Sequence, residues 1–378
     1  KALQRGVLEL QLADGRIFRI DGADAGKYAR VISHDDRVWS RLIREGDMGF
    51  SDAYLDGQWT SPDIQAFLDV VFDNFLEISR SYPGAGLLRM YERLRHWMRQ
   101  NTKAQAKKNI ARHYDLGNDF YAKWLDDTMT YSSALFVTGQ ESLEQAQIQK
   151  YASICDQMGM QNGDHILEIG CGWGGFAEYA ASQRGATLKC ITISKEQYNY
   201  AKERIFKAGL AQNVDIVLQD YRDEKGHFDG IASIEMFEAV GEKYWQPYFK
   251  TVHDCLKPGK QATLQVITMA DHLFGDYRKT VDFIQKYIFP GGMLPSPTRL
   301  RQVIKQSGLD ICGSIEFGVS YSITLRRWYD AFNANWDDIE GENFDNRFKN
   351  MWNYYLTSCA AGFEYGTTDV TQITMRRV

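Results

Sequence analysis

The chain has 378 residues and a formal net charge of -5, with 44% apolar and 25% charged residues. That length allows two domains or one large domain with an extension, and the apolar content predicts a packed core rather than a disordered chain. The negative net charge argues against nucleic acid as a partner, because proteins that bind duplexes usually carry a surplus of Lys and Arg.

The cysteine and histidine pattern argues against a metal site. Six scattered cysteines form no C-x-x-C pair, and the histidines form no H-E-x-x-H motif, so neither bound zinc nor a disulfide framework is predicted. Unpaired thiols fit a reducing cytoplasm. The sequence lacks a run of about 18 apolar residues, so no membrane-spanning helix is expected.

The first hundred residues predict a mostly helical domain with a short hairpin. Apolar residues alternate over residues 7–20 on both sides of a central Asp-Gly pair, which is a hairpin signal. Residues 39–75 then follow helical periodicity. We divide the chain into an N-terminal domain, residues 1–100, and a catalytic domain, residues 101–378.

A basic segment spans the boundary between the two domains. Residues 89–113 contain eight Lys or Arg and one acidic residue, and apolar residues recur nearby at helical spacing. A basic amphipathic helix is attracted to an anionic membrane by roughly 1 kcal/mol per basic side chain. The alternative is a solvated helix packed on a neighbouring domain.

From residue 163 onward, short apolar strands alternate with helices. This order predicts a doubly wound α/β sheet with parallel strands. The expected strands are residues 164–169, 187–193, 214–219, 228–234 and 262–268, and the expected helices are residues 176–184, 195–208 and 244–255.

The sharpest motif is E-I-G-C-G-W-G-G at residues 168–175, between a predicted strand and a predicted helix. Glycines let the backbone turn tightly and approach a ligand without an intervening Cβ. Gly170, Gly172 and Gly175 also satisfy the G-x-G-x-x-G pattern of sites for NAD or FAD, so a dinucleotide is one candidate cofactor.

Two features favour S-adenosylmethionine (SAM). Glu168 precedes the loop, where its carboxylate suits a cationic methionine group but would repel a pyrophosphate. An NAD site expects an acid about 20 residues further on, and the next predicted strand ends in I-T-I-S without one. Asp220 and Tyr221 follow the third strand, where a carboxylate and a ring suit adenine.

Several motifs in a fixed order carry a family resemblance. They are R-H-Y-D-L-G-N at 112–118, T-Y-S at 130–132, the loop at 168–175, Q-D-Y-R-D at 219–223, M-F-E-A-V-G at 236–241 and K-Y-I-F-P-G-G at 286–292. The sequence resembles the cyclopropane-fatty-acyl-phospholipid synthase family, which includes the mycolic acid cyclopropane synthases. The resemblance implies a Rossmann-like class I SAM-dependent methyltransferase domain. Its substrate would be the cis double bond of an unsaturated phospholipid acyl chain. The enzyme would be a cytoplasmic protein that binds peripherally to the inner face of the membrane.

The resemblance also implies which residues bind SAM. The first three residues below are expected to close over its methionine end, and the remainder to line its backbone, ribose and adenine. The set is Tyr114, Tyr131, Ser132, Glu168, Gly170, Gly172, Thr192, Ile193, Gln197 and Asp220.

An alkene is a weak nucleophile, so holding it in line with the methyl group supplies much of the rate. Methyl transfer leaves a carbocation on the acyl chain, which aromatic faces stabilise without trapping it. Tyr131, Tyr287 and Tyr321 are our candidates for that task.

Ring closure needs a base. In the family a bound bicarbonate takes the proton, held by a Cys, a Glu, a His and a Tyr. The resemblance assigns Glu238 and Tyr321 to two of these places, but the Cys position is Ser133 and the His position is Gln265. Ser and Gln still donate hydrogen bonds, although neither carries the positive charge of His. A cyclopropane is therefore expected if the anion site persists, and a methylene- or methyl-branched chain if it is lost.

Three alternatives stay open. Glu238 could be an acid at a helix N-terminus, where the helix dipole stabilises it. The enzyme could methylate a small molecule, although such chemistry usually uses a general base and only His113 accompanies the motifs. A non-catalytic lipid-binding module is the third. A homodimer is compatible with the resemblance.

Overall fold

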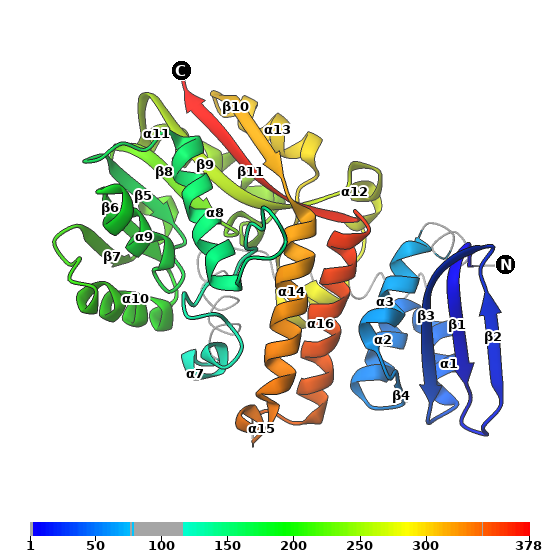
Figure 1. The fold of residues 1–378 in the computed structure, drawn as a ribbon. Coiled ribbons are helices and arrows are strands. Elements are labelled where there is room, and N and C mark those ends of the chain that lie inside the picture. Colours follow the sequence, from blue (N-terminus) through cyan, green and yellow to red (C-terminus); the bar gives the residue numbers. More distant parts are fainter. Residues whose placement is uncertain (1–2, 76–77, 79–115, 342) are drawn as a thin grey trace.

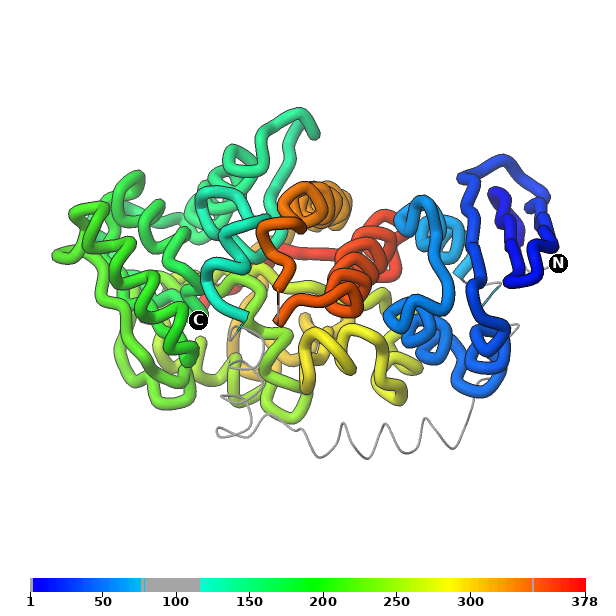
Figure 2. The backbone as a smooth tube through the Cα atoms, turned by 90° about the horizontal axis from the view of Figure 1, so that it is seen from below, coloured from blue at the N-terminus to red at the C-terminus, as the bar shows by residue number. Residues whose placement is uncertain are grey.

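The computed structural model describes residues 3–75, 78, 116–341 and 343–378. Figure 1 shows two long helices, α14 (Gly318–Ala334) and α16 (Asn346–Glu364), between an N-terminal sheet and a larger sheet. Figure 2 shows the same order from below. Tyr114, the basic segment and the expected boundary at residue 100 lie outside the described residues.

The N-terminal unit is built on a four-stranded sheet in the order β2-β1-β3-β4. The predicted hairpin is confirmed, because β1 and β2 pair antiparallel, and β1 also pairs with β3 in parallel. Among the described residues of this unit, three helices accompany the sheet, and β3 and β4 are strands that the sequence did not predict: the first half of β3 is exposed, which hides the alternation of a strand. The elements are β1 (Arg5–Gln11), β2 (Ile17–Asp21), β3 (Asp24–Ser33), α1 (Arg37–Glu45), α2 (Asp47–Leu55), β4 (Trp59–Thr60) and α3 (Ile64–Asp73).

Helix α3 joins this unit to the remainder of the molecule. Asp63 caps its N-terminus by accepting a hydrogen bond from the Ala66 N–H. Phe67 and Leu68 then belong to the same apolar core as residues of α14 and α16, including Trp328. The N-terminal unit therefore shares a core with the helix pair.

The large sheet has seven strands in the order β10-β11-β9-β8-β5-β6-β7. The predicted strands, β5 to β9, pair in parallel, whereas β11, which the sequence did not predict, runs antiparallel to both β9 and β10. Strand β11 follows α16 in the chain, pairs along its length with β9, and lies between β9 and β10. The strands are β5 (His165–Ile169), β6 (Thr187–Thr192), β7 (Val214–Leu218), β8 (Phe228–Ile234), β9 (Leu256–Met269), β10 (Leu309–Glu316) and β11 (Thr368–Arg377).

Three of the helices that flank this sheet were predicted from the sequence, namely Gly175–Arg184, Lys195–Lys207 and Trp245–Cys255. Helix α8 starts at a capping box of Ser142 and Gln145 and ends at left-handed Gly159, and α10 is capped by Ser194. The helices are α7 (Asn118–Ala122), α8 (Leu143–Met158), α9 (Gly175–Arg184), α10 (Lys195–Lys207), α11 (Trp245–Cys255), α12 (Asp271–Tyr277), α13 (Pro297–Gln306) and α15 (Trp336–Ile339). Short turns are η1 (Tyr221–Asp223), η2 (Phe237–Ala239), η3 (Glu242–Tyr244) and the π-helix η4 (Ile284–Ile288).

The strand order locates the ligand site. β5 lies between β6 and β8, so chain connections diverge to opposite sides at its carboxyl end, where open α/β sheets bind ligands. Across the described ranges, no helix combines the length and apolar composition needed to cross a bilayer. Nor do the described side chains include a cluster of three or more His, Cys, Asp or Glu suited to a metal ion.

Candidate active site

A cavity of about 720 Å³ begins at the carboxyl ends of β5, β6, β7 and β8 and extends between α3, α14 and α16. We call its two parts the polar half and the apolar half. The polar half includes Glu168, Gly170, Gly172, Thr192, Ile193, Gln197, Gln219 and Asp220. The apolar half includes Leu68, Val71, Phe72, Phe75, Ile267, Met269, Leu273, Leu294, Leu325 and Phe363.

The glycine loop opens the polar half. Gly170 has a φ of +84° and a Cβ there would lie 2.6 Å from Met236 Cγ, so only glycine fits. Gly172 has a φ of +52° and a Cβ there would project into open space. The loop backbone is thus exposed to a ligand.

Glu168 lies at the floor of the polar half, 2% exposed. Burial raises the pKa of its carboxyl to about 7. Its Oε2 atom has no hydrogen-bond partner among the described residues. A buried, unsatisfied carboxylate oxygen beside an open glycine loop fits a cationic group such as the ammonium of SAM.

The residues expected at the ribose and adenine line the same half. Thr192 Oγ1 donates to Gln197 Oε1 at 3.0 Å, which fixes the Gln197 amide. Asp220 is held by Arg222, whose Nη2 donates to Asp220 Oδ2 at 2.6 Å. The structure therefore brings Thr192, Ile193, Gln197 and Asp220 together as predicted.

Tyr131 and Ser132 line the cavity where the two halves meet. The Tyr131 ring packs 5.3 Å from Trp328 and 6.4 Å from Phe289 between centroids, and its hydroxyl lies 2.7 Å from that of Tyr355. Ser132 Oγ accepts a hydrogen bond from the buried Lys150 Nζ at 2.8 Å. Aromatic side chains therefore surround the place where the polar and apolar halves of the cavity meet.

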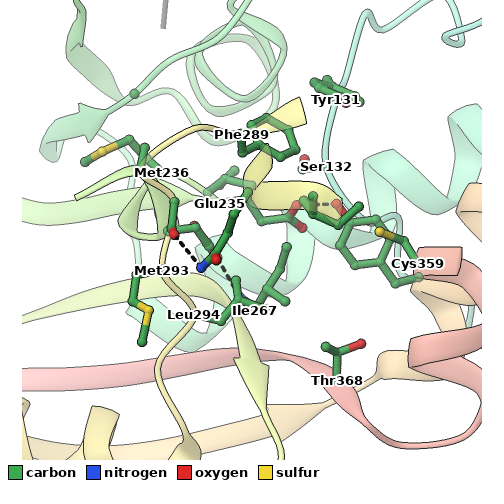
Figure 3. Close-up of a pocket in the computed structure, with 18 of the residues that line it drawn as sticks. Tyr131, Ser132, Glu235, Met236, Ile267, Phe289, Met293, Leu294, Cys359 and Thr368 are labelled. Atoms are coloured by element: carbon green, nitrogen blue, oxygen red, sulfur yellow. Dashed lines mark hydrogen bonds between the residues drawn. The ribbon is translucent and has the colours of Figure 1, made fainter. Parts of the chain in front are cut away.

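Glu235 is the centre of a cluster of hydrogen-bonded side chains, and it was not predicted. It follows β8 directly, and its carboxylate accepts hydrogen bonds from the Ser133 backbone N–H at 2.8 Å, Gln265 Nε2 at 2.8 Å and Tyr321 Oη at 2.6 Å. Figure 3 shows Glu235 amid the drawn lining residues, with Tyr131 and Phe289 on one side and Ile267 and Met293 on the other. Three groups expected to hold an anion thus hold this side chain.

The backbone at this point is strained. Glu235 has a φ of +49° and Met129 a φ of +52°, and they are the non-glycine residues with positive φ in the described part of the chain. Both line the cavity. A left-handed conformation is costly for a residue with a side chain, and such residues cluster at functional sites.

Ser133 and Gln265 lie behind Glu235 and do not line the cavity. The Ser133 hydroxyl donates instead to the Ala134 carbonyl at 2.9 Å, so Ser133 reaches Glu235 through its backbone. Both residues are completely buried. They are therefore in the predicted cluster but support a carboxylate rather than face a ligand.

Glu238 lies beside Glu235 on the cavity wall. Its Oε1 accepts the Ile267 N–H at 2.6 Å, and its Oε2 lacks a hydrogen-bond partner in the described structure. Burial, followed by the Glu235 charge, raises the pKa of Glu238 to about 8. Glu238 is therefore mostly protonated at neutral pH. Burial also raises the pKa of Glu235, and the hydrogen bonds that its carboxylate accepts oppose this rise.

Tyr287 is not brought to the reaction centre. It does not line the cavity, and its hydroxyl donates to Asp52 Oδ1 of α2 at 2.6 Å, while Lys286 pairs with Asp52 Oδ2 at 2.9 Å. The wider turn of the π-helix directs this side chain toward the N-terminal unit. The predicted catalytic place of Tyr287 is thus corrected.

Fold and site together define a methyltransferase that uses SAM. The model of the mycolic acid cyclopropane synthetase family matches residues 101–373. The chain belongs to this family, and it is a SAM-dependent methyltransferase of the cyclopropane synthase type with the expected class I fold.

Two relatives and one solved structure show the extent of the similarity. The chain is 36% identical to the tuberculostearic acid methyltransferase UfaA1 of Mycobacterium tuberculosis, over 98% of this chain and 88% of the relative. It is also 36% identical to the cyclopropane-fatty-acyl-phospholipid synthase of Escherichia coli, over 90% and 85%. The mycolic acid cyclopropane synthase CmaA1, complexed with SAH and CTAB, superposes with a TM-score of 0.66 at 28% identity, covering 71% of this chain and 98% of CmaA1.

Proposed function

We propose that this enzyme transfers a methyl group from SAM to the double bond of an unsaturated fatty-acyl chain, and that Glu235 takes up the proton lost afterwards. The main support for this proposal is the cluster of hydrogen bonds around Glu235. Its carboxylate already occupies the Ser133, Gln265 and Tyr321 donors. A second anion there would lack these donors and would be repelled by Glu235.

The apolar half supports an acyl chain as the substrate. Its walls come from helices and strand ends that present aliphatic and aromatic side chains, and a narrow apolar cavity of this kind favours a hydrocarbon. The names of relatives point the same way, since they include fatty acid and sphingolipid methyltransferases.

The residues suggest a division of labour. SAM, when bound, supplies an electrophilic methyl group. Tyr131 and Phe289 present aromatic faces that stabilise the carbocation left on the acyl chain. Glu235 then accepts a proton from the carbon skeleton, and the C–H electron pair closes a new C–C bond or a new double bond. Tyr321 donates to Glu235 Oε2 and holds the carboxylate in position.

We propose a methylene- or methyl-branched chain as the product, because Glu235 fills the place in which the family holds bicarbonate. A cyclopropane is the second candidate, favoured by the 36% identity to the cyclopropane synthase of E. coli. Both products add the same one-carbon unit, so mass alone does not separate them.

The test is incubation with SAM and vesicles of a monounsaturated phospholipid, followed by proton NMR of the released acyl chains. Vinylidene or methyl-doublet signals without cyclopropyl protons support the branched product. High-field cyclopropyl protons support the second candidate. Absence of modified lipid would contradict the acyl-chain proposal and favour a small-molecule methyltransferase.

We also propose that the enzyme works peripherally at an anionic membrane, because residues 89–113 carry eight basic side chains against one acid. Co-sedimentation with phosphatidylglycerol vesicles should weaken as salt is raised. Equal binding to zwitterionic vesicles would contradict this part of the proposal.

A further inference from the structure

Two buried glutamines connect Glu235 to helix α8. Gln372 on β11 lies opposite Gln265 on β9 in the strand register, and both side chains are 0% exposed. A completely buried amide needs a partner for its carbonyl and for its amino group. The partners of Gln372 therefore determine which way its amide points.

Two side chains of helix α8 donate hydrogen bonds to the side-chain carbonyl of Gln372. Ser153 Oγ donates to Gln372 Oε1 at 2.7 Å, and Gln157 Nε2 donates to the same oxygen at 2.5 Å. A reversed Gln372 amide would turn its own NH₂ group toward the Gln157 donor. The carbonyl must therefore face α8, and the NH₂ group must face the interior.

That NH₂ group fixes the next amide. Gln372 Nε2 donates to Gln265 Oε1 at 3.1 Å and to the Lys150 carbonyl at 3.4 Å. Gln265 Nε2 is thereby turned to Glu235 Oε1 at 2.8 Å and to the Ser133 carbonyl at 3.2 Å. A reversed Gln265 would set its carbonyl against a carboxylate and another carbonyl, with no proton between them.

We propose that Gln372 is a positioning residue for the reaction: it holds the Gln265 amide in the one orientation that donates to Glu235, and so keeps Glu235 ionised and directed into the cavity. This inference rests on the proposed function, in which Glu235 is the base. Strand β11 contributes Thr368 to the cavity wall. Gln372 on the same strand does not line the cavity, and its proposed role is to orient the Gln265 amide.

Other charged or titratable groups also act on Glu235. Burial lowers the pKa of Lys150 of α8 to about 7, and its charged form favours the ionised carboxylate of Glu235, while Tyr321 of α14 donates to that carboxylate directly. Glu238 of η2 is a like-charged neighbour once it ionises. Gln372 bonds to the backbone carbonyl of Lys150 and to none of these three side chains, so a shift in the acid limb that Gln265→Met shares reports the lost hydrogen bond.

The experiment compares Gln372→Met, Gln265→Met and the double variant by the pH dependence of kcat/KM for the acyl substrate at saturating SAM, so that SAM binding through Glu168 does not set the acid limb. Loss of a hydrogen bond to a carboxylate raises its pKa, so each single variant should move the acid limb upward by about one pH unit and slow the reaction about tenfold below it. If Gln372 acts through Gln265, the double variant should be no slower than Gln265→Met.

Thr374→Val is the matched control. Thr374 is also on β11, is 3% exposed, and bonds to Thr263 of β9 with the hydroxyl oxygens 2.9 Å apart. Removing this buried cross-strand pair should lower thermal stability but leave the acid limb unchanged. Should Gln372→Met fail to fold, Gln372→Glu serves in its place, because its second carboxylate oxygen would reverse Gln265 and shift the limb further.

An unchanged acid limb in the Gln372 variant, or additive losses in the double variant, would overturn the inference. The proposed function fails by a different result, namely substantial turnover by Glu235→Gln. Loss of turnover in Glu235→Gln together with a normal profile in Gln372→Met would therefore reject the positioning role alone.

Discussion

The polar and apolar halves of the cavity are built in different ways. The polar half comes from loops that follow three neighbouring parallel strands, β5, β6 and β7, and each loop contributes a short run of sequence. The apolar half takes its side chains from Leu68 on α3 as well as Phe363 on α16, positions almost 300 residues apart. The first half is a local motif, whereas the second exists only after tertiary packing.

This difference separates what each half recognises. The polar half offers backbone, a buried carboxylate and oriented amides, which select a cofactor by charge and hydrogen bonds. The apolar half selects by shape and hydrocarbon contact, which tolerates variation. Glu235 lies where the two meet, so changes there should affect chemistry rather than the binding of either ligand.

The largest effect is expected for Glu235→Gln. An amide cannot accept the proton, so turnover should fall about 10²–10⁴-fold while SAM binding, measured by calorimetry, stays within about twofold. Glu238→Gln is the matched control, since Glu238 is already protonated at neutral pH and a glutamine can still accept from Ile267; its loss should be under about tenfold. Equal losses in the two variants would contradict the assignment.

Glu168→Gln tests the polar half. The lost charge pairing should weaken SAM binding by about ten- to a hundredfold. Because the pKa of Glu168 is raised to about 7, SAM affinity of the unmodified enzyme should rise as pH increases from about 5.5 to 7, as the carboxyl ionises. Calorimetry across this range should show a flat profile for the variant, and a persisting slope would assign the effect to another group.

Val71→Phe tests the apolar half. Val71 of α3 lines the cavity, so the larger phenylalanine side chain should reduce the length of acyl chain that fits. We expect kcat/KM for the longest accepted acyl chains to fall about tenfold relative to shorter ones, with SAM binding unchanged. Ile43→Phe, at a 78% exposed position of α1, should leave chain preference unaltered. The same shift in both variants would argue against α3 as a wall of the acyl site.

The remaining prediction concerns stability rather than activity. The pKa of Glu238 is raised from 4.5 to about 8, so the folded protein holds its proton after the unfolded chain has lost it. The stabilisation is complete below pH 4.5 and is lost as pH rises through 8. Denaturation of Glu238→Gln should therefore show a growing advantage over the parent across this window, up to about 1.4 kcal/mol per pH unit. A constant difference would indicate an ordinary pKa.

Local patterns explain which parts of the fold were predictable. The glycine loop and the strands from β5 to β9 were anticipated because alternation, capping and glycine spacing act over a few residues. The antiparallel direction of β11 and the sheet pairing of β3 depend on partners distant in sequence. Neither direction nor pairing is encoded in the alternation of one strand.

The catalytic cluster was predictable in part. Ser133, Gln265 and Tyr321 were placed correctly near one another, but the carboxylate they hold is Glu235, three residues before the predicted Glu238. The position of Glu235 immediately after a buried strand was the signal that could have identified it. The family motif instead contains Glu238. Tyr287 was misplaced because a π-helix alters side-chain direction in a way that periodicity does not reveal.

The most direct test of the central claim is turnover in buffer freed of carbon dioxide, followed by proton NMR of the acyl product for the unmodified enzyme and for Glu235→Ala. We predict that the unmodified enzyme is indifferent to added bicarbonate. Glu235→Ala should be inactive and regain turnover with formate or bicarbonate, because either anion can occupy the emptied space among the same donors. If the unmodified enzyme loses turnover without bicarbonate and Glu235→Ala remains active, Glu235 is not the base.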